Sequence, residues 1–224
     1  MKILALSTST PRGSAALVRD GEAVAAVAYA DLQGHAERIF QAIDAVLEQA
    51  GERRGTLDAI ACDVGPGSFT GVRVGVASAK GIAFGLGLPL AGVVSLEAMA
   101  AAAFGAGEAG AADVVLAAID AKKGEVFLAA YGHDGAARLA PAARPLAPEA
   151  FALEPPAGGR LVVVGEVAAG LALPAGVRLA RGPALDLPDA AWVARLAAAR
   201  VGSPADADTL EPLYVRPPDA VPAR

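Results

Sequence analysis

A glycine-rich segment, residues 63–75, holds the residues whose types and spacing could do chemistry. It lies between an apolar run and a run of small residues with helical spacing, and such a turn can present backbone N–H groups to phosphate. It is not a Walker A loop, because valine and arginine follow Gly71, and Thr70 stands where the dinucleotide fingerprint needs its third glycine. The glycines equally fit a tight, closely packed connection. The candidate phosphate contacts here are Gly65, Gly67, Ser68 and Thr70.

A second group of hydroxyls, residues 7–10, ends the first expected strand and could reach a phosphate from the rim of a sheet. Ser7 and Thr8 are the candidate contacts, although turn chemistry explains the same residue types. His35 and His133 lie in separate expected loops and make no metal or catalytic pair. No serine lies in a Gly-x-Ser-x-Gly elbow. The sequence therefore offers no catalytic residue and no metal site.

Hydrophobic periodicity and turn residues predict the elements that position these groups. Three strands joined by tight turns precede a helix–strand–helix–strand–helix order, which is typical of a mixed-sheet α/β fold. A Gly/Ala run at 105–112 is the expected hinge to a second, proline-richer unit. The expected strands are 2–8, 14–19, 22–30, 57–64, 90–94, 114–120, 125–131 and 161–164, and the expected helices are 36–50, 72–86, 96–104 and 189–201.

Composition restricts the classes of protein. The 224 residues are 54% hydrophobic with a net charge of -5, which excludes disordered, collagen-like and coiled-coil chains. The longest uncharged stretch, 81–96, contains glycines and Pro89 and is too short and broken to span a bilayer. The opening residues predict a strand and not a signal peptide, and the single cysteine, Cys62, favours a cytoplasmic location. The acidic balance makes any nucleic-acid role indirect.

Five blocks of the sequence together resemble one known family: residues 1–17, 35–47, 63–80 with 89–96, 119–131 and 211–216. The run GPGSFTGVR at 65–73 is the most distinctive of them. These blocks resemble the bacterial TsaB family, also called YeaZ, whose members take part in making threonylcarbamoyladenosine on tRNA. The resemblance implies an actin-like ATPase (ASKHA) superfamily fold of two RNase H-like lobes. The first lobe is expected at 1–105, with 205–224 returning to it, and the second, reduced lobe at 106–204.

The resemblance also implies a pseudoenzyme, related to the catalytic TsaD subunit that transfers the threonylcarbamoyl group. In that relative two metal-binding histidines stand at positions that match Ser95 and Met99, and the family's first strand usually ends in an acidic residue where this chain has Ser7. A hydroxyl and a thioether are poor ligands for such an ion. The chain is therefore expected to be non-catalytic, with no cofactor of its own.

Glycine destabilises a helix by about 1 kcal/mol relative to alanine, so the glycines of the small-residue helix 72–86 indicate a close contact. Together with the apolar stripe on helix 36–50, they favour a surface for partner helices. The resemblance implies a TsaD-type catalytic paralogue and a TsaE-type ATPase as partners, a homodimer when the chain is alone, only indirect tRNA contact and no membrane contact. ATP or ADP could bind at the joint with the catalytic partner. The expected interface residues are Ile39, Ile43, Val46, Val72, Val76 and Ala79.

An alternative hypothesis is an independent small-molecule kinase or ATPase that uses residues 65–71 and 7–10 as phosphate loops. Ser7 in place of an acidic residue weighs against it, as does the lack of an obvious carboxylate beside the loop to hold magnesium. Nucleotide turnover by the purified chain discriminates between the two hypotheses.

Overall fold

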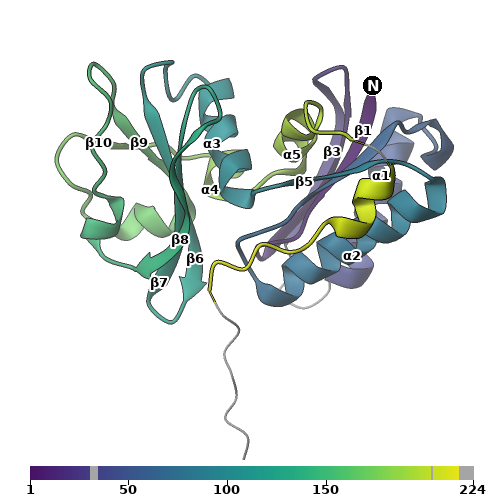
Figure 1. The fold of residues 1–224 in the computed structure, drawn as a ribbon, viewed down its shortest axis with the longest axis horizontal. Helices are drawn as coiled ribbons and strands as arrows, with labels where there is room; N and C mark the ends of the chain where they lie inside the picture. Colours follow the sequence, from purple (N-terminus) through teal and green to yellow (C-terminus); the bar gives the residue numbers. More distant parts are fainter. Residues whose placement is uncertain (31–34, 203, 217–224) are drawn as a thin grey trace, which may run out of the picture.

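The computed structural model describes residues 1–30, 35–202 and 204–216 of the chain. Two five-stranded mixed sheets stand side by side, with helices around and between them (Figure 1). Each sheet and its helices form one lobe, so the mixed-sheet α/β class expected from the sequence is confirmed.

The first sheet has the strand order β3-β2-β1-β4-β5. Its first three strands form an antiparallel meander, and β4 and β5 then run parallel to β1. Alternation along β1 sends Leu4 and Leu6 to one face and Ile3 and Ala5 to the other, as a side-chain period of two requires. The strands are β1 Lys2–Ser7, β2 Arg12–Arg19, β3 Glu22–Ala30, β4 Ala59–Asp63 and β5 Leu90–Val93.

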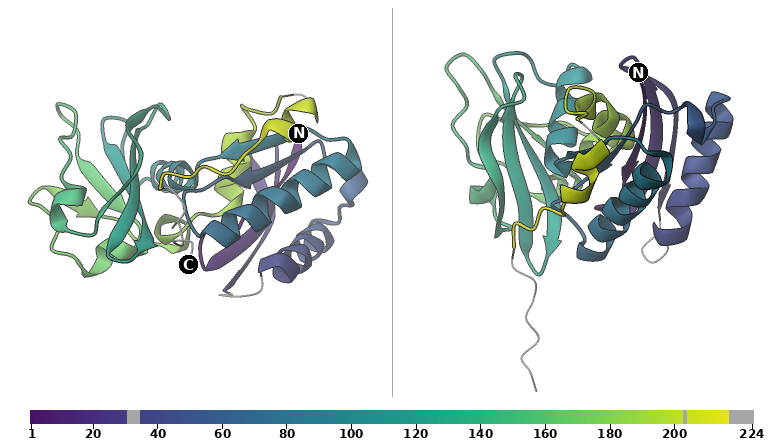
Figure 2. Two further views of the ribbon diagram at one scale, coloured as in Figure 1. Left: turned by 60° about the horizontal axis from the view of Figure 1, so that its bottom comes forward. Right: turned by 45° about the vertical axis from the view of Figure 1, so that its right-hand side comes forward.

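Helices cover both faces of this sheet (Figure 2). α1 (His35–Ala50) and α2 (Phe69–Leu86) pack on the face of Leu4 and Leu6. α5 (Ala190–Ala197) packs on the opposite face. The 3-10 helices η1 (Arg54–Thr56) and η4 (Pro204–Thr209) complete the lobe, with η4 lying against α2 and β5.

The second sheet repeats the topology of the first. Its order, β8-β7-β6-β9-β10, again joins an antiparallel meander to two parallel strands. α3 (Ser95–Gly105) packs on one face, and the 3-10 helices η2 (Pro148–Phe151) and η3 (Glu166–Gly170) lie on the other, in the chain positions that α1 and α2 hold in the first lobe. The strands are β6 Val114–Lys122, β7 Glu125–Gly132, β8 Ala137–Pro145, β9 Leu161–Val164 and β10 Val177–Leu179, and a short helix, α4 (Pro183–Asp186), follows them.

Several boundaries differ from those expected. β8 and β10 were not predicted, because β8 contains two prolines, which a strand tolerates at a sheet edge, and β10 has only three residues. α2 begins three residues early, since the Ser68 hydroxyl caps it by accepting from the Gly71 amide at 3.3 Å. The chain returns to the first sheet with α5, before residue 205, and residues 215–216 reach the second lobe.

Glu52, just after α1, ties the start of β1 to the end of β2. Its carboxylate accepts hydrogen bonds from Lys2 at 2.9 Å, Arg19 at 2.6 Å and Thr56 at 2.6 Å. The bonds from Lys2 and Thr56 lower the pKa of Glu52 to about 2 from its ordinary 4.5. Because the folded-state pKa lies below the unfolded value, this stabilisation is present above pH 4.5 and is lost as the pH falls toward 2.

We therefore expect Glu52→Gln to flatten the acid-side decline of the urea unfolding midpoint between pH 4.5 and 2. Glu48→Gln, at an exposed position of α1, is the control and should leave the decline unchanged. A Glu52→Gln midpoint that falls as steeply as the parent's contradicts the role given to Glu52.

Candidate functional site

The two expected phosphate loops pack against each other. The Ser68 amide donates to the Ser9 carbonyl oxygen at 2.6 Å, and the Thr8 hydroxyl donates to the Gly71 carbonyl oxygen at 2.8 Å. Residues 7–10 are at most 1% exposed. Each loop therefore covers part of the polar surface that the other would offer to a phosphate.

Three glycines at a spacing of four residues permit this contact. A Cβ on Gly67 would lie 2.1 Å from the Ser9 carbonyl oxygen, and one on Gly71 would lie 2.1 Å from the Thr8 carbonyl oxygen. A Cβ on Gly75 would lie 2.3 Å from Thr8 Oγ1. Residues four apart share one face of a helix, so this row lays the start of α2 directly on the end of β1. Close packing thus accounts for these glycines.

A buried carboxylate, Asp63, binds the residues at the end of β1 through hydrogen bonds. It accepts hydrogen bonds from the Ser7 hydroxyl at 2.8 Å, the Ser9 hydroxyl at 2.5 Å and the Thr8 amide at 3.1 Å, and the Ser95 hydroxyl lies 3.3 Å away. Burial raises the pKa of Asp63, while these donors favour its charged form. Sequence reasoning gave Asp63 no role, although an acidic residue that ends an apolar strand was the available signal.

These contacts correct part of the expected phosphate site. Ser7, Thr8 and Gly65 are buried, and both hydroxyls already donate within the protein, so the three residues cannot contact a ligand in this arrangement. Ser68 and Thr70 are exposed and Gly67 is partly exposed. A phosphate contact at these three residues stays a prediction.

A cleft of about 680 Å³ lies between the lobes. Residues 9–11 and 66–71 form its first-lobe wall, and residues 119–122 with Phe127 form its second-lobe wall. Residues 213–216 close a third side. Small-molecule sites commonly measure about 300–1,000 Å³, so the cleft has the size of a ligand site. At its rim Lys122 is paired with Asp120 at 2.6 Å.

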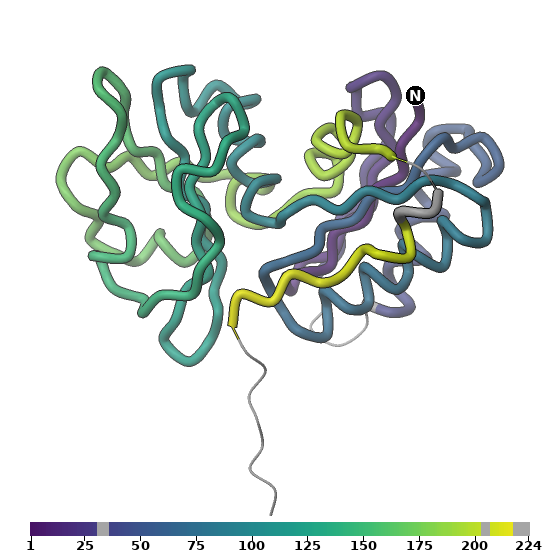
Figure 3. The backbone as a smooth tube through the Cα atoms, in the orientation of Figure 1, coloured from purple at the N-terminus to yellow at the C-terminus, as the bar shows by residue number. Residues whose placement is uncertain are grey.

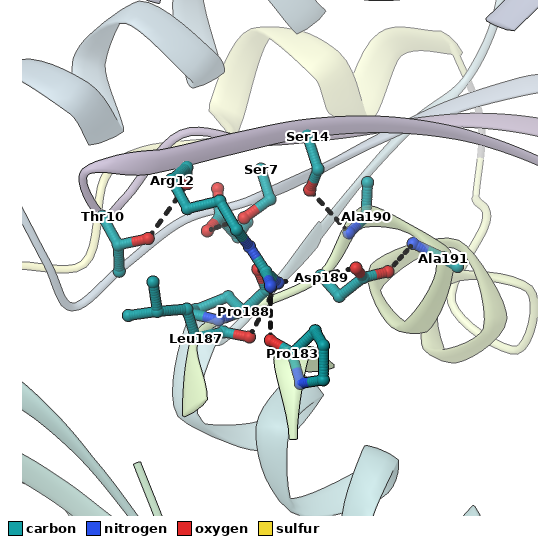
Figure 4. Close-up of polar contacts among 11 residues, drawn as sticks. Ser7, Thr10, Arg12, Ser14, Pro183, Leu187, Pro188, Asp189, Ala190 and Ala191 are labelled. Carbon is teal, nitrogen blue, oxygen red and sulfur yellow. Dashed lines mark hydrogen bonds and ion pairs between the residues drawn. The ribbon is translucent and has the colours of Figure 1, made fainter. Parts of the chain in front are cut away.

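Arg12 fixes the chain segment that returns from the second lobe to the first (Figure 4). Its guanidinium donates to the carbonyl oxygens of Leu187 at 3.1 Å and Pro188 at 3.0 Å, and also to that of Pro183. It pairs with Asp189 at 3.5 Å. Burial lowers the pKa of Arg12. This one side chain therefore anchors the linker between α4 and α5 to the start of β2.

The six residues expected at the partner interface do not lie on the surface of the protein. All six are at most 4% exposed and belong to the core between the first sheet and its two helices. They face the sheet because a bulky apolar stripe is buried first by the protein's own core. A partner cannot touch them without unfolding the lobe. The residues are Ile39, Ile43, Val46, Val72, Val76 and Ala79.

The opposite sides of the same two helices are exposed. On α2 the row Ala77, Gly81 and Gly85 faces solvent beside Phe84, whose side chain is 86% exposed. A Cβ on Gly81 or Gly85 would meet nothing within 4 Å. On α1, Phe40 is 43% exposed. We call these five residues the helix face.

No group of three or more His, Cys, Asp or Glu side chains suited to a metal ion occurs in the described part of the chain. Ser95 and Met99 are both buried on α3, and Met99 lies in the core of the second lobe. Among the described residues, no helix combines the length and the apolar character needed to cross a bilayer.

Two lobes of one topology with a cleft between them define a two-lobed α/β protein. The sequence model of the family TsaD, tRNA N6-adenosine threonylcarbamoyltransferase, matches residues 30–152. YeaZ from Pseudomonas aeruginosa superimposes with a TM-score of 0.75 at 30% identity, over 95% of this chain and 99% of that one.

The tRNA threonylcarbamoyladenosine biosynthesis protein TsaB of Escherichia coli K12 is 42% identical over 134 residues. That match covers 60% of this chain and 56% of that protein, so the chain spans about half the length of this curated relative. An uncharacterized protein of Mycobacterium tuberculosis H37Rv is 34% identical over 98% of this chain and 94% of its own length. The chain belongs to the TsaB (YeaZ) family.

The glycine row generates a test with an internal control. We expect Gly71→Ala to lower the free energy of unfolding by about 1–3 kcal/mol, because its Cβ would collide with the Thr8 backbone. Gly81→Ala, on the same helix, should raise it by up to about 1 kcal/mol, since the Cβ enters open space and alanine favours helix. Urea unfolding monitored by circular dichroism measures both. Equal effects of the two substitutions contradict the packing role of the row.

Proposed function

We propose that this chain acts in the cytoplasm as a non-catalytic subunit in threonylcarbamoyladenosine synthesis on tRNA, by binding a TsaD-type catalytic paralogue through the helix face. The proposal rests on the family and on one observation: Phe84 stands almost fully exposed beside a row of small residues. Large exposed aromatic residues next to closely approachable backbone are features of protein–protein contacts.

Packing within the lobe does not require the exposed glycines of α2. Glycine in a helix interior costs about 1 kcal/mol relative to alanine, and Gly71 and Gly75 compensate for that cost by letting α2 lie against Thr8. A Cβ at Gly81 or Gly85 would enter open space, so packing within the described residues does not require their lack of a side chain, and a neighbour outside this chain would. A partner helix that lies along Ala77, Gly81 and Gly85 explains both their size and their exposure.

A paralogue of the same fold is the partner that this face fits best. Two related lobes can present equivalent helix pairs to each other about a pseudo-twofold axis, and the same face can pair with its own copy when the paralogue is absent. Recruitment of a TsaE-type ATPase, ATP or ADP at the joint with the paralogue, and tRNA contact through the paralogue alone complete the proposal.

A non-catalytic role is supported by the polar groups at the end of β1. The Ser7 and Ser9 hydroxyl groups donate to Asp63, and the Thr8 hydroxyl donates to the Gly71 carbonyl oxygen in the first turn of α2. These three hydroxyl groups are therefore not left to donate to a bound nucleotide. Activation of the paralogue would then be a population shift, in which this chain binds the active arrangement of the partner more tightly than the inactive one.

The helix face is tested by Gly81→Arg and Phe84→Ala. A side chain added at Gly81 would enter open space and the Phe84 ring is exposed, so the fold should persist. We expect Gly81→Arg to abolish binding to the TsaD-type paralogue, and Phe84→Ala to weaken it about 30-fold or more, measured by isothermal titration calorimetry.

Ala198→Arg, at an exposed helix end on the opposite face of the first sheet, is the matched control and should bind normally. Parent-like binding by both helix-face variants excludes this surface as the interface.

The role in synthesis is tested by reconstitution. We expect threonylcarbamoyladenosine to form on tRNA from the other components only when this chain is added, and expect Gly81→Arg to fail where Ala198→Arg succeeds. Equal product with and without the chain contradicts an activating role. ATP turnover by the purified chain alone would instead favour the kinase or ATPase alternative.

A further inference from the structure

Residues 210–216 form an extended segment that crosses from the first lobe to the second. The yellow end of the tube runs beside α2 and finishes at the β6–β7 hairpin (Figure 3). Within this segment the contacts change lobes: Leu210 and Leu213 pack on the first-lobe core, whereas Val215 packs on the second-lobe core.

The first half of the segment is anchored on the β4–β5 edge of the first lobe. Leu210 fills the space above Gly92, where a Cβ would lie 2.5 Å from the leucine Cδ1. The Leu213 amide donates to the Val64 carbonyl oxygen at 2.7 Å. Gly65 lies directly against the Leu213 carbonyl, since a Cβ there would be 3.1 Å from its oxygen. This half of the segment is therefore bound to the first lobe by side-chain packing and by a backbone hydrogen bond.

The middle of the segment joins the start of α2. The Tyr214 hydroxyl accepts a hydrogen bond from Arg73 Nε at 2.8 Å, and the Tyr214 and Phe69 rings lie 5.4 Å apart. The Arg73 guanidinium stacks on Phe69, 3.6 Å from the ring centroid. These three side chains make a compact aromatic–arginine joint of the kind stabilised by cation–π attraction.

The last described residue of the segment holds the second lobe. Arg216 pairs with Glu125 of β7 at 2.5 Å and lies 3.4 Å from the Ala121 carbonyl oxygen at the hairpin end of β6. Both charged side chains are partly exposed, so the pair alone contributes little. The segment is therefore attached to the second lobe by the Arg216–Glu125 ion pair together with the packing of Val215 on the core.

We propose that residues 210–216 are a latch that fixes the angle between the two lobes. The chain itself crosses between the lobes twice, from β5 to α3 and from α4 to α5, and two crossings leave a rotation about the line that joins them. The packing of α3 on α5 and the pair between Glu97 and Arg200 join the elements that directly follow these two crossings. The latch is a further non-covalent contact at a third place, on the wall of the cleft, and it opposes that rotation. It also forms one wall of the cleft, so its release widens the cleft without breaking either core.

The latch touches the same helix that carries the helix face. Arg73 and Phe69 lie four and eight residues before Ala77, so they continue its row toward the N-terminus of α2. Under the proposed function, a paralogue seated on α2 would therefore lie next to the latch. The latch itself is tested on this chain alone, so its failure and that of the proposed interface are distinguishable.

Distances between two spin labels test the latch. Cysteines replace Glu48 on α1 and Ala136 in the β7–β8 turn, both exposed, while the native Cys62 is fully buried and stays unlabelled. Dilution with unlabelled chain removes distances between copies. We expect one narrow distance distribution for the parent and a broader, longer one for the double variant Tyr214→Ala/Arg216→Ala.

Arg178→Ala is the matched control, because it removes an arginine that pairs with Glu108 away from the latch. It should keep the parental distribution. Glu125→Gln removes only the partly exposed ion pair, so it should broaden the distribution less than the double variant does. Hydrogen exchange should show faster exchange of the Leu213 amide in the double variant, with β1 and β6 still protected. A parental distance distribution in that folded double variant overturns the proposal.

Discussion

The close contact between α2 and the end of β1 is the constraint on which the first lobe depends. Gly67, Gly71 and Gly75 bring the backbone of the loop and helix against Thr8 and Ser9, where any side chain would collide. A helix laid so closely on a sheet has a fixed rotation about its own axis. The contact therefore decides which residues of α2 enter the core and leaves Gly81, Phe84 and Gly85 facing solvent.

The same contact requires buried polar groups to be satisfied internally, because an unpaired buried carboxylate or hydroxyl is costly. Asp63 meets this requirement with donors from the ends of β1 and β5–α3, including Ser95. Ligands of open α/β sheets commonly bind outside the carboxyl ends of parallel strands. Here Asp63 and the hydroxyl groups of Ser7 and Ser9 fill the space directly beyond the ends of β1 and β4. Ser68 and Thr70, on the wall of the cleft, stay exposed.

The sequence predicted the order and type of most elements because long periodic segments carry their own signal. It missed β8, where prolines hide an edge strand, and it did not place Asp63 beside Ser7, 56 residues apart, because only the parallel pairing of β1 and β4 joins them. The prediction that six apolar residues form a partner surface was wrong for a different reason. Periodicity shows that Ile39, Ile43 and Val46 share a face, but not whether that face meets the chain's own sheet or a partner. The size of the apolar side chains decides which side of the helix enters the chain's own core, because the bulkier stripe is buried first.

α2 joins three features that the sequence treated separately. Its first turns close the candidate phosphate loop, its outer row carries the helix face, and Phe69 with Arg73 holds Tyr214 of the latch. A rigid helix carries a displacement along its length better than a loop does, since its backbone hydrogen bonds move together. A partner that binds α2 differently in two lobe arrangements would therefore shift the balance between them. Under the proposed function, this would give the chain a physical means to act on a partner: the chain would contribute a preset geometry, and the chemistry would take place in the partner.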